Sequence, residues 1–304
     1  MRVLVTGDTG FVGRHAVKAL AQAGHDVIPF HIDGRPGDLR IVGEVDSRVA
    51  SARPEACLHL GGIAFVPACW EDPALAMNVN VVGTMNLLES FRRHAPSARI
   101  VFVSTAQVYG NSSDATPLDE DAPLRPENAY AVSKMAADVQ CLLHARRYGM
   151  PVMTARPSNH IGPGQSPDFV VSSFVRQVVA IRSGKTAPVM RVGNLESERD
   201  FLDVRDIVRG YEALIQSGTG GRAYNLASNR FVSIRWMLDT LCSLAGVSPS
   251  IEIDPTLFRP TDTQPRLSTH RITSETGWKP SIPLEQTLRD LLDEAMSDST
   301  AANR

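Results

Sequence analysis

A tyrosine and a lysine four residues apart, Tyr130 and Lys134, form a pair suited to acid–base chemistry. They fall within residues 128–148, whose pattern predicts a helix, so the two side chains would lie on one helix face. A free phenol has a pKa of about 10, which is high for proton transfer at neutral pH. A neighbouring ammonium favours the phenolate, so we expect Lys134 to lower the pKa of Tyr130 toward the working range.

A hydroxyl group upstream could act on the same substrate oxygen. Residues 101–105 predict a strand that runs out into a loop. In a parallel sheet, side chains at the carboxyl ends of strands face the ligand crevice. Ser104 or Thr105 could therefore donate a hydrogen bond beside Tyr130.

Three glycines with the spacing G-x-x-G-x-x-G separate a predicted strand at 2–6 from a predicted helix at 11–23. Such glycines permit a tight turn, let backbone N–H groups approach a pyrophosphate and let the helix pack closely on the sheet. The sequence therefore predicts a dinucleotide site. An acid beside a diphosphate is unfavourable, so we expect Asp8 to point to solvent. The expected phosphate turn consists of Gly7, Gly10, Phe11, Val12 and Gly13.

The residues that would meet the adenosine ribose give conflicting signals. Asp33 follows the second predicted strand, at 25–30, and an acid there would bind the ribose 2′-hydroxyl of NAD. Arg35 lies two residues further on and would suit the 2′-phosphate of NADP. The choice between the two cofactors stays open.

The elements that must position these residues alternate between apolar strands and helices, which is the pattern of a parallel sheet covered by helices. After Arg156 the chain becomes richer in Pro, Gly, Ser and Asn. We predict an α/β fold, a Rossmann-type doubly wound parallel sheet with a smaller, interleaved C-terminal substrate domain. Residues 1–160, with about 200–228, would form the dinucleotide-binding domain, and residues 161–199 and 229–304 the substrate domain.

Composition bounds the class of protein. The 304 residues are 43% hydrophobic and 21% charged with a net charge of −2, and no long basic run suggests nucleic-acid binding. No apolar stretch approaches the roughly 20 residues of a membrane span, and the N-terminus lacks a signal-peptide pattern. The four cysteines are scattered without C-x-x-C spacing, so no metal site is expected. We expect a cytoplasmic enzyme that binds neither nucleic acid nor membrane.

Together these motifs resemble the extended short-chain dehydrogenase/reductase family, also described as the NAD-dependent epimerase/dehydratase family, over nearly the whole chain. Residues 104–110, S-T-A-Q-V-Y-G, resemble the family stretch S-[ST]-x-x-V-Y-G. This resemblance assigns the catalytic hydroxyl to Thr105. It implies that Tyr130 donates or accepts the proton and that Lys134 holds the nicotinamide ribose of NADPH or NADH.

The resemblance also implies further cofactor contacts. Asp38-Leu39 looks like the acidic-apolar pair that brackets adenine, with an ordinary loop acid as the alternative. Residues 59–62, H-L-G-G, correspond to the H-L-A-A strand end beside the cofactor, and Asn80 to a structural asparagine. With the turn glycines, the expected cofactor contacts are Asp33, Asp38, Leu39, Leu60, Gly61, Gly62, Asn80 and Lys134.

Members of this family share a hydride step and differ in what accompanies it. The 4,6-dehydratases carry an Asp-Glu pair directly after the catalytic threonine, which supplies the acid and base that elimination of water needs. Here the two positions are Ala106 and Gln107, which exchange no proton. A reductase or an epimerase is therefore favoured over a dehydratase.

Other stretches narrow the expected substrate. Residues 156–165, R-P-S-N-H-I-G-P-G-Q, resemble the R-P-F-N-H-I-G-P-G-Q of the bacterial GDP-4-keto-6-deoxy-D-mannose reductases, as do residues 65–67 and 198–204. The serine in place of phenylalanine leaves the particular sugar open. The resemblance implies NAD(P)H-dependent reduction of a nucleotide-diphosphate 4-keto-6-deoxy sugar. The implied substrate contacts are Val66, Thr105, Gln107, Asn159, Arg199 and Arg259.

Two alternatives stay open. One is a nucleotide-sugar 4-epimerase that retains tightly bound NAD. The other, less favoured because both Tyr130 and Lys134 are kept, is a non-catalytic dinucleotide-binding scaffold, since fold alone does not set function. The resemblance also suggests a homodimer packed through helices around 82–94 and 128–148. The apolar residues there could equally face the core; they are Leu87, Leu88, Leu142 and Leu143.

Overall fold

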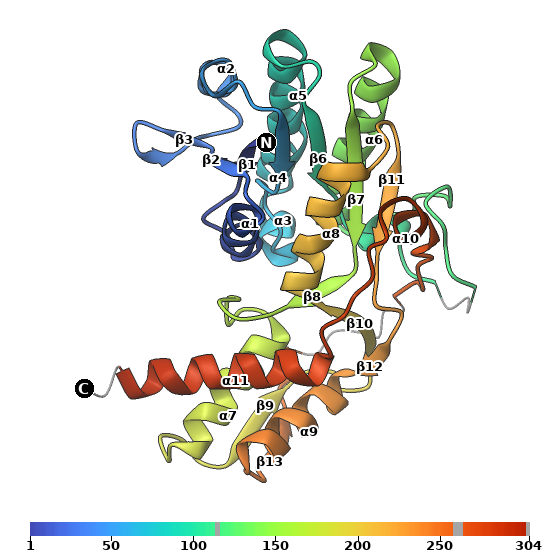
Figure 1. The fold of residues 1–304 in the computed structure, drawn as a ribbon. Helices are drawn as coiled ribbons and strands as arrows, with labels where there is room; N and C mark the ends of the chain where they lie inside the picture. Colours follow the sequence, from blue (N-terminus) through green and yellow to red (C-terminus); the bar gives the residue numbers. More distant parts are fainter. Residues whose placement is uncertain (113–115, 258–263, 302–304) are drawn as a thin grey trace. The chain divides into compact units, whose positions relative to one another are not determined.

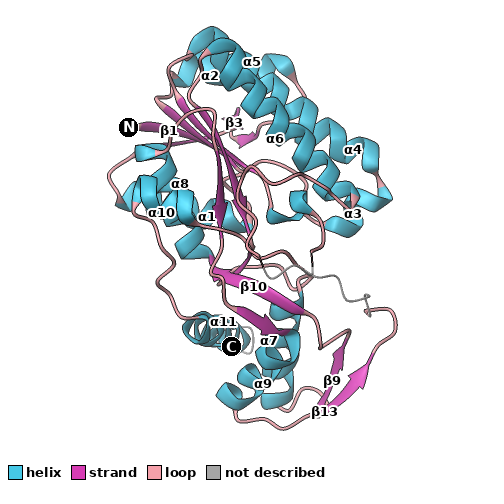
Figure 2. Ribbon diagram, turned by 90° about the vertical axis from the view of Figure 1, so that its right-hand side faces the viewer, coloured by secondary structure: helices cyan, strands magenta, loops and turns pink. Residues whose placement is uncertain are grey.

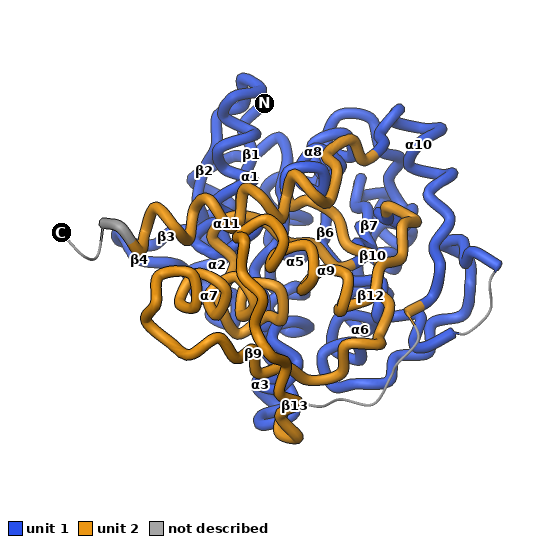
Figure 3. Tube along the Cα trace, turned by 90° about the horizontal axis from the view of Figure 1, so that it is seen from below, with its two compact units in different colours: residues 1–158, 205–227, 265–279 blue, residues 159–204, 228–264, 280–304 orange. Residues whose placement is uncertain are grey.

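The computed structural model describes residues 1–112, 116–257 and 264–301, and the chain divides into two compact units. Figure 1 shows the elements and Figure 3 colours the two units. Unit 1 comprises Met1–Ser158, Arg205–Ala227 and Pro265–Lys279, and unit 2 comprises Asn159–Val204, Ser228–Gln264 and Pro280–Arg304. The units are interleaved in sequence, because the chain passes repeatedly from one to the other.

Unit 1 is built on a six-stranded parallel sheet with the strand order β11-β7-β6-β5-β1-β2. Its central strands are buried almost throughout, as apolar strands covered on both faces should be. The predicted doubly wound parallel sheet is confirmed. The strands are β1 (Arg2–Thr6), β2 (Asp26–Pro29), β5 (Ala56–His59), β6 (Arg99–Val103), β7 (Val152–Pro157) and β11 (Ala223–Leu226).

Helices cover both faces of this sheet (Figure 2). On one face, the apolar sides of α2 (Val42–Ala52), α5 (Gly83–His94) and α6 (Ala129–Tyr148) form a core with the strands. On the other face lie α1 (Phe11–Gln22) and α8 (Val204–Ser217). The buried side chains of the first face include Leu4, Val45, Cys57, Leu87, Leu88, Phe91, Phe102, Ala137 and Cys141.

The segment that leads into α5 differs from the single helical segment predicted over 73–94. It consists of α4 (Pro73–Met77), the five-residue π-helix η1 (Asn78–Val82) and α5, in that order. Such π-helical turns are frequent at functional sites. Here the turn carries Asn80, whose side chain is buried.

The order of the strands creates a crevice. Strand β1 lies between β2 and β5, so the direction of winding reverses beside it, and Thr6 pairs with His59 at the carboxyl ends of β1 and β5. Ligands of open α/β sheets bind outside the carboxyl ends of the strands at such a reversal. The fold therefore directs a ligand to the edge that Thr6 and His59 share.

Unit 2 has its own small sheets and core. Strands β8 (Asn159–Ile161), β10 (Glu198–Asp203) and β12 (Phe231–Ser233) form one sheet, and β9 (Val189–Val192) pairs with β13 (Ser250–Ile253). Apolar side chains of its helices pack into one cluster. These helices are α7 (Val170–Arg182), α9 (Ile234–Ala245) and α11 (Leu284–Ala301). Among the described residues of the chain, no helix is both long and apolar enough to span a membrane.

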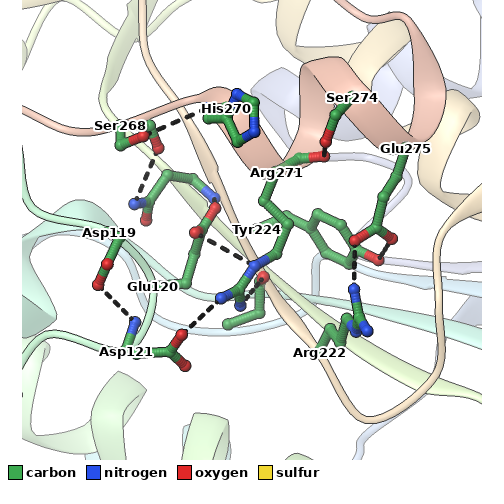
Figure 4. A network of polar contacts seen from close by, with 12 residues as sticks. Asp119, Glu120, Asp121, Arg222, Tyr224, Ser268, His270, Arg271, Ser274 and Glu275 are labelled. Carbon is green, nitrogen blue, oxygen red and sulfur yellow. Dashed lines mark hydrogen bonds and ion pairs between the residues drawn. The ribbon is translucent and has the colours of Figure 1, made fainter.

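Residues 265–279 differ from the expected division, which placed them with the substrate domain. They belong to unit 1 because their partners lie there: the Trp278 indole N–H donates to the Asp206 carbonyl at 2.9 Å. Helix α10 (His270–Thr276) carries Arg271, which contacts Glu120 at 3.4 Å and Asp121 at 2.7 Å (Figure 4). These contacts are between residues distant in sequence, so local pattern gives no sign of them.

A buried ion pair joins α6 to β7. The Arg156 guanidinium donates to both carboxylate oxygens of Asp138, at 2.9 and 3.1 Å, and the two side chains are 3% and 0% exposed. Arg156 also donates to the Tyr109 hydroxyl and to the Glu120 carbonyl oxygen, both at 2.9 Å. The charge is thus fully compensated, which is the condition under which a buried pair is tolerated.

Replacing Arg156 by Met should destabilise the protein by about 3–5 kcal/mol, because the Asp138 carboxylate would remain buried without a counter-charge. Urea-induced unfolding measures the change. The double variant Arg156→Met/Asp138→Leu removes both charges and should recover a large part of the loss. Wild-type stability of the single variant, or no recovery in the double variant, contradicts this account.

Candidate active site

A cavity of about 360 Å³, hereafter the glycine-turn cavity, lies in unit 1 at the carboxyl ends of β1 and β5. Its volume falls in the range of roughly 300–1,000 Å³ that is typical of small-molecule sites. The lining comes from five separate segments of unit 1. The lining residues are Thr6, Gly7, Asp8, Thr9, Phe30, Pro36, Gly37, Asp38, Leu39, Arg40, Gly61, Gly62, Ile63 and Val79.

The glycine turn is closely packed. Gly7 has a positive φ of 70°, and a Cβ there would lie 2.8 Å from the Gly61 nitrogen. A Cβ on Gly13 would lie 2.0 Å from the Gly7 carbonyl oxygen. Helix α1, whose first turn holds Phe11 and Val12, has no side-chain N-cap and no acid in that turn, so its N-terminal N–H groups suit an anion. These features fit the diphosphate of a dinucleotide.

Contrary to the expectation, the Asp8 side chain does not point to solvent. Its side chain is only 11% exposed, and its carboxylate lies 3.0 Å from Nε2 of His31 in strand β3 (His31–Ile32). Asp8 also lines the glycine-turn cavity. The His31 imidazole thus lies beside the Asp8 carboxylate, where water was expected.

Of the three residues predicted to meet the adenosine, Asp38 and Leu39 line the cavity and Asp33 does not. Asp33 has a φ of 49° and sits in the turn between β3 and β4 (Arg35–Pro36). Asp38 accepts hydrogen bonds from Arg40, Nε to Oδ1 at 2.9 Å and Nη2 to Oδ2 at 2.6 Å. These bonds hold the pKa of Asp38 below its usual value. Arg35 is engaged by Glu44.

The loop after β5 connects the cavity to helix α6. Leu60 donates its N–H to the Thr6 carbonyl at 3.2 Å, and a Cβ on Gly62 would lie 2.7 Å from Asn80 Oδ1 and 3.9 Å from Lys134 Nζ. Asn80 is 1% exposed, and its amide exchanges hydrogen bonds with the backbone of Ile63. The predicted residues of this loop therefore do lie together.

Thr105, Tyr130 and Lys134 are all buried in the same region of unit 1, at 7%, 9% and 6% exposure. Thr105 caps the short helix η2 (Ala106–Tyr109): its Oγ1 accepts from the Gln107 N–H at 3.2 Å. Its own proton is therefore available to the phenol of Tyr130, to which it hydrogen-bonds. The structure thus pairs Tyr130 with Thr105, the residue favoured over Ser104.

Burial dominates the electrostatics of this site. Burial raises the pKa of Tyr130 to about 12, and the hydrogen bond from Thr105 opposes that rise. Burial also lowers the pKa of Lys134 to about 8, opposed by Cys141 and Asp138. The ammonium therefore loses its proton before the phenol does. The expected lowering of the tyrosine pKa by Lys134 is not seen, because the groups that shift the pKa of Tyr130 are its burial, Thr105 and Cys69.

The lysine has an aromatic partner that the sequence analysis did not identify. Lys134 Nζ lies 4.6 Å from the ring centroid of Phe102 on β6, a cation–π contact that offsets part of the cost of burying the charge. Asn128 was also missed. Its side chain caps α6 by accepting from the Ala131 N–H at 2.8 Å, and it donates to Gln107 Oε1 at 2.9 Å. Its position just before a helix was the available signal.

The predicted substrate contacts fall in different parts of the chain. In unit 1, Val66 begins α3 (Val66–Glu71) and packs against the cluster that contains Tyr130. In unit 2, Asn159 donates to Gln264 Oε1 at 3.0 Å, and Arg199 donates to the Glu198 carbonyl at 2.8 Å. Arg259 lies outside the described residues. Within the described part of the chain, no cluster of three or more His, Cys, Asp or Glu could hold a metal ion.

This chain is similar to known enzymes over most of its length. A family model described as GDP-mannose 4,6 dehydratase matches residues 31–291. GDP-6-deoxy-D-mannose reductase from Pseudomonas aeruginosa is 36% identical over 300 residues, which cover 96% of each protein. The structure of RMD from P. aeruginosa complexed with NADPH matches with a TM-score of 0.91 and 36% identity, covering 98% of this chain and 99% of that one.

An epimerase is also similar. The structure of UDP-glucose 4-epimerase from Thermus thermophilus complexed with NAD has a TM-score of 0.85 and 28% identity, and it covers 97% of this chain and 99% of that one. The chain is therefore similar, over nearly its full length, to a reductase and to an epimerase.

Replacing Lys134 by Met should stabilise the protein at pH 7, by an amount on the order of 3 kcal/mol. The folded pKa of about 8 lies below the ordinary 10.5, so folding works against the charge at pH values below 8. Between pH 8 and 10.5 the unfolded chain binds more protons, and wild-type stability rises with pH relative to the variant.

Urea unfolding at pH 7 and at pH 10 measures this difference. Lys18→Met, at an exposed position of α1, is the matched control and should show little change. A Lys134→Met protein that is less stable than wild type at pH 7 would show that burial of the ammonium is not costly.

Proposed function

The chain belongs to the GDP-mannose 4,6-dehydratase family of NAD(P)-dependent reductases, dehydratases and epimerases, and on that basis we propose that it is a nucleotide-sugar 4-ketoreductase. Its substrate is a nucleotide-linked 4-keto-6-deoxy sugar, GDP-4-keto-6-deoxy-D-mannose or a close relative, and its co-substrate is NADPH or NADH. The observation that carries the proposal is a buried, neutral Tyr130, hydrogen-bonded to Thr105, in the unit that holds the glycine-turn cavity.

Residues of unit 1 would hold the cofactor. Gly7, Gly10 and Gly13 leave room for its diphosphate at the start of α1, Leu39 and Asp38 flank its adenine, and Lys134 binds its nicotinamide ribose. When bound, the reduced nicotinamide supplies a hydride to the carbonyl carbon at C4 of the sugar.

Side chains of this protein supply the proton that the sugar oxygen receives. With the sugar bound, Thr105 turns the hydroxyl proton that it otherwise donates to Tyr130 toward the C4 carbonyl oxygen and polarises it. Tyr130 gives its own proton to that oxygen as negative charge develops there. Lys134 then stabilises the phenolate left on Tyr130. Placing these groups in advance, in a site from which water is largely excluded, supplies most of the catalytic advantage.

The protonation state of Tyr130 suits the acid role that reduction requires. With a pKa raised to about 12 by burial, the phenol keeps its proton at neutral pH and can act as an acid. An enzyme that first oxidises its sugar needs a base at this position. The elimination step of a dehydratase is not supported, because Ala106 is apolar and Gln107 is an amide bonded to Asn128.

The residues expected to bind the nucleotide diphosphate are Asn159, Arg199 and Arg259 of unit 2. Guanidinium groups match phosphate oxygens with two parallel hydrogen bonds, which suits the two arginines to this role. Unit 2 is accordingly proposed as the nucleotide-sugar-binding part of the chain, and unit 1 as the dinucleotide-binding part.

The assay that tests this function follows NADPH or NADH oxidation with a panel of GDP-, dTDP-, UDP- and CDP-linked keto-sugars. We expect stoichiometric oxidation with a GDP-linked 4-keto-6-deoxy sugar. Interconversion of sugar epimers by protein that carries bound NAD, without added cofactor, would instead establish the alternative, a 4-epimerase, which the similarity to the T. thermophilus enzyme supports.

Replacing Tyr130 by Phe should lower kcat by about 10²–10⁴-fold, because the proton donor is lost, while NADPH affinity changes little. Steady-state kinetics and fluorescence titration of NADPH measure the two quantities. Tyr148→Phe, at an exposed position of the same helix, is the control. Turnover at the wild-type rate in Tyr130→Phe removes the phenol from the mechanism.

We also propose that the chain forms a homodimer through the outer surfaces of α5 and α6. Leu87 and Leu88, two of the residues expected there, are instead buried in the core of unit 1. Leu143, which was also expected there, is exposed, and Val132 and Val139 recur with it along one side of α6. Val82 at the end of η1 and Met85 in the first turn of α5 are exposed as well. Exposed apolar side chains gathered on neighbouring helices are typical of an interface.

The double variant Val139→Glu/Leu143→Glu should convert the dimer to a monomer, because it places charges in an apolar contact. Sedimentation velocity measures the change. Val42→Glu, on the exposed side of α2, is the control and should leave the dimer intact. Sedimentation of the wild-type protein as a monomer contradicts the proposal.

A further inference from the structure

A series of buried hydrogen bonds connects the wall of the glycine-turn cavity to helix α5. The Gly61 N–H donates to Thr6 Oγ1 at 3.0 Å, and Thr6 Oγ1 lies 2.7 Å from His59 Nδ1. On the other side of the ring, His59 Nε2 lies 2.9 Å from Thr84 Oγ1. Thr6, His59 and Thr84 are almost completely buried.

The hydrogen bond of Thr84 to Asn80 determines which group is the donor in each of the other bonds of this series. Thr84 Oγ1 donates its single proton to the Asn80 carbonyl oxygen at 2.7 Å, so it can only accept from His59. His59 must therefore carry its proton on Nε2 and leave Nδ1 as an acceptor for Thr6. Thr6, having donated, accepts from the Gly61 N–H. The contacts are consistent with only one tautomer of the neutral imidazole.

The series continues to the helix of the catalytic pair. Asn80 is the residue whose carbonyl accepts from Thr84, and its side chain donates to Ser133 Oγ at 2.8 Å. Ser133 in turn donates to the carbonyl oxygen of Tyr130 at 2.8 Å. One set of buried contacts thus runs from the backbone at Gly61 to the backbone at Tyr130.

We propose that His59 and Thr84 are positioning residues, which fix the Gly61 wall of the glycine-turn cavity relative to the part of α6 that carries Tyr130 and Lys134. This inference rests on the proposed function, because it assigns the wall to a dinucleotide and the helix to catalysis. His59 itself exchanges no proton in the reaction. Burial, reinforced by the charge of Lys134, lowers its pKa to about 3, so it stays neutral and its tautomer stays fixed.

Thr84→Val tests the role, because it keeps the shape of the side chain and removes the hydroxyl. We expect kcat to fall by roughly ten- to a hundredfold, with weaker NADPH binding, as loss of a supporting hydrogen bond that displaces catalytic groups typically does. Thr84→Ser keeps the hydroxyl and should restore both. Ser90→Ala, which removes another buried hydroxyl of α5 outside this series, should leave kcat unchanged.

A second readout needs no activity. NMR of the protein with ¹⁵N-labelled histidine should show His59 protonated on Nε2 alone, and in Thr84→Val this preference should be lost. A wild-type His59 protonated on Nδ1 overturns the inference even where Thr84→Val does not fold. If Thr84 has a purely structural role, Thr84→Val will have a lower urea midpoint but an unchanged kcat in the folded protein. That result also overturns the inference.

The two proposals fail in distinguishable ways. If the wild-type protein binds no NADPH and oxidises none with any keto-sugar, the proposed function fails, and the positioning role fails with it. If the wild type is active and Thr84→Val matches it in kcat and NADPH affinity, only the positioning role is refuted.

Discussion

The ammonium of Lys134 lies inside the protein, one helical turn from a phenol that is also buried, and much of unit 1 reduces the cost of that arrangement. The Phe102 ring faces Nζ, and the Asp138 carboxylate, itself neutralised by Arg156, raises the lysine pKa against the effect of burial. Gly62 leaves room beside the lysine for the Asn80 amide, because a Cβ at this position would lie 2.7 Å from Asn80 Oδ1. A buried ammonium that opposes folding is consistent with the role that we propose for Lys134 in the reaction.

The same burial decides what the tyrosine can do. In water the phenol and the ammonium would titrate at similar pH values, and the lysine could help to ionise the tyrosine. Inside the protein their pKa values move apart in opposite directions, so the phenol holds its proton at neutral pH and can act as the acid of the proposed reduction. In the proposed reaction, the charge left on Tyr130 after proton transfer would be compensated by the Lys134 ammonium, which already lies on the same helix.

The sequence predicted those features of the candidate site that depend on residues close together in the chain. The strand–glycine–helix order at Gly7 to Gly13, the helical spacing of Tyr130 and Lys134, and the strand end at Thr105 each depend on a few adjacent residues. Asp33 could also have been recognised, because Asp-Gly at 33–34 is a strong hairpin signal, and the structure has a turn there.

Other features depend on contacts between distant segments, and no local pattern reports them. The placement of residues 265–279 in unit 1 depends on Asp206, Glu120 and Asp121, and the pKa of Lys134 depends on how completely α6 is covered. The π-helix at Asn78–Val82 interrupts a segment whose apolar spacing suits a continuous helix. The role of this π-helix is evident only from the hydrogen bonds that the Asn80 side chain makes with Ile63 and Ser133.

In the reaction that we propose, Tyr130 protonates an oxygen whose carbon receives a hydride. The most direct measurement is reduction of GDP-4-keto-6-deoxy-D-mannose with NADPH deuterated at the transferable position, followed by NMR of the product. We predict one deuterium at sugar C4 for the wild-type protein, and none formed at a comparable rate by Tyr130→Phe. A product without deuterium at C4, or label retained entirely in the cofactor, would contradict the claim.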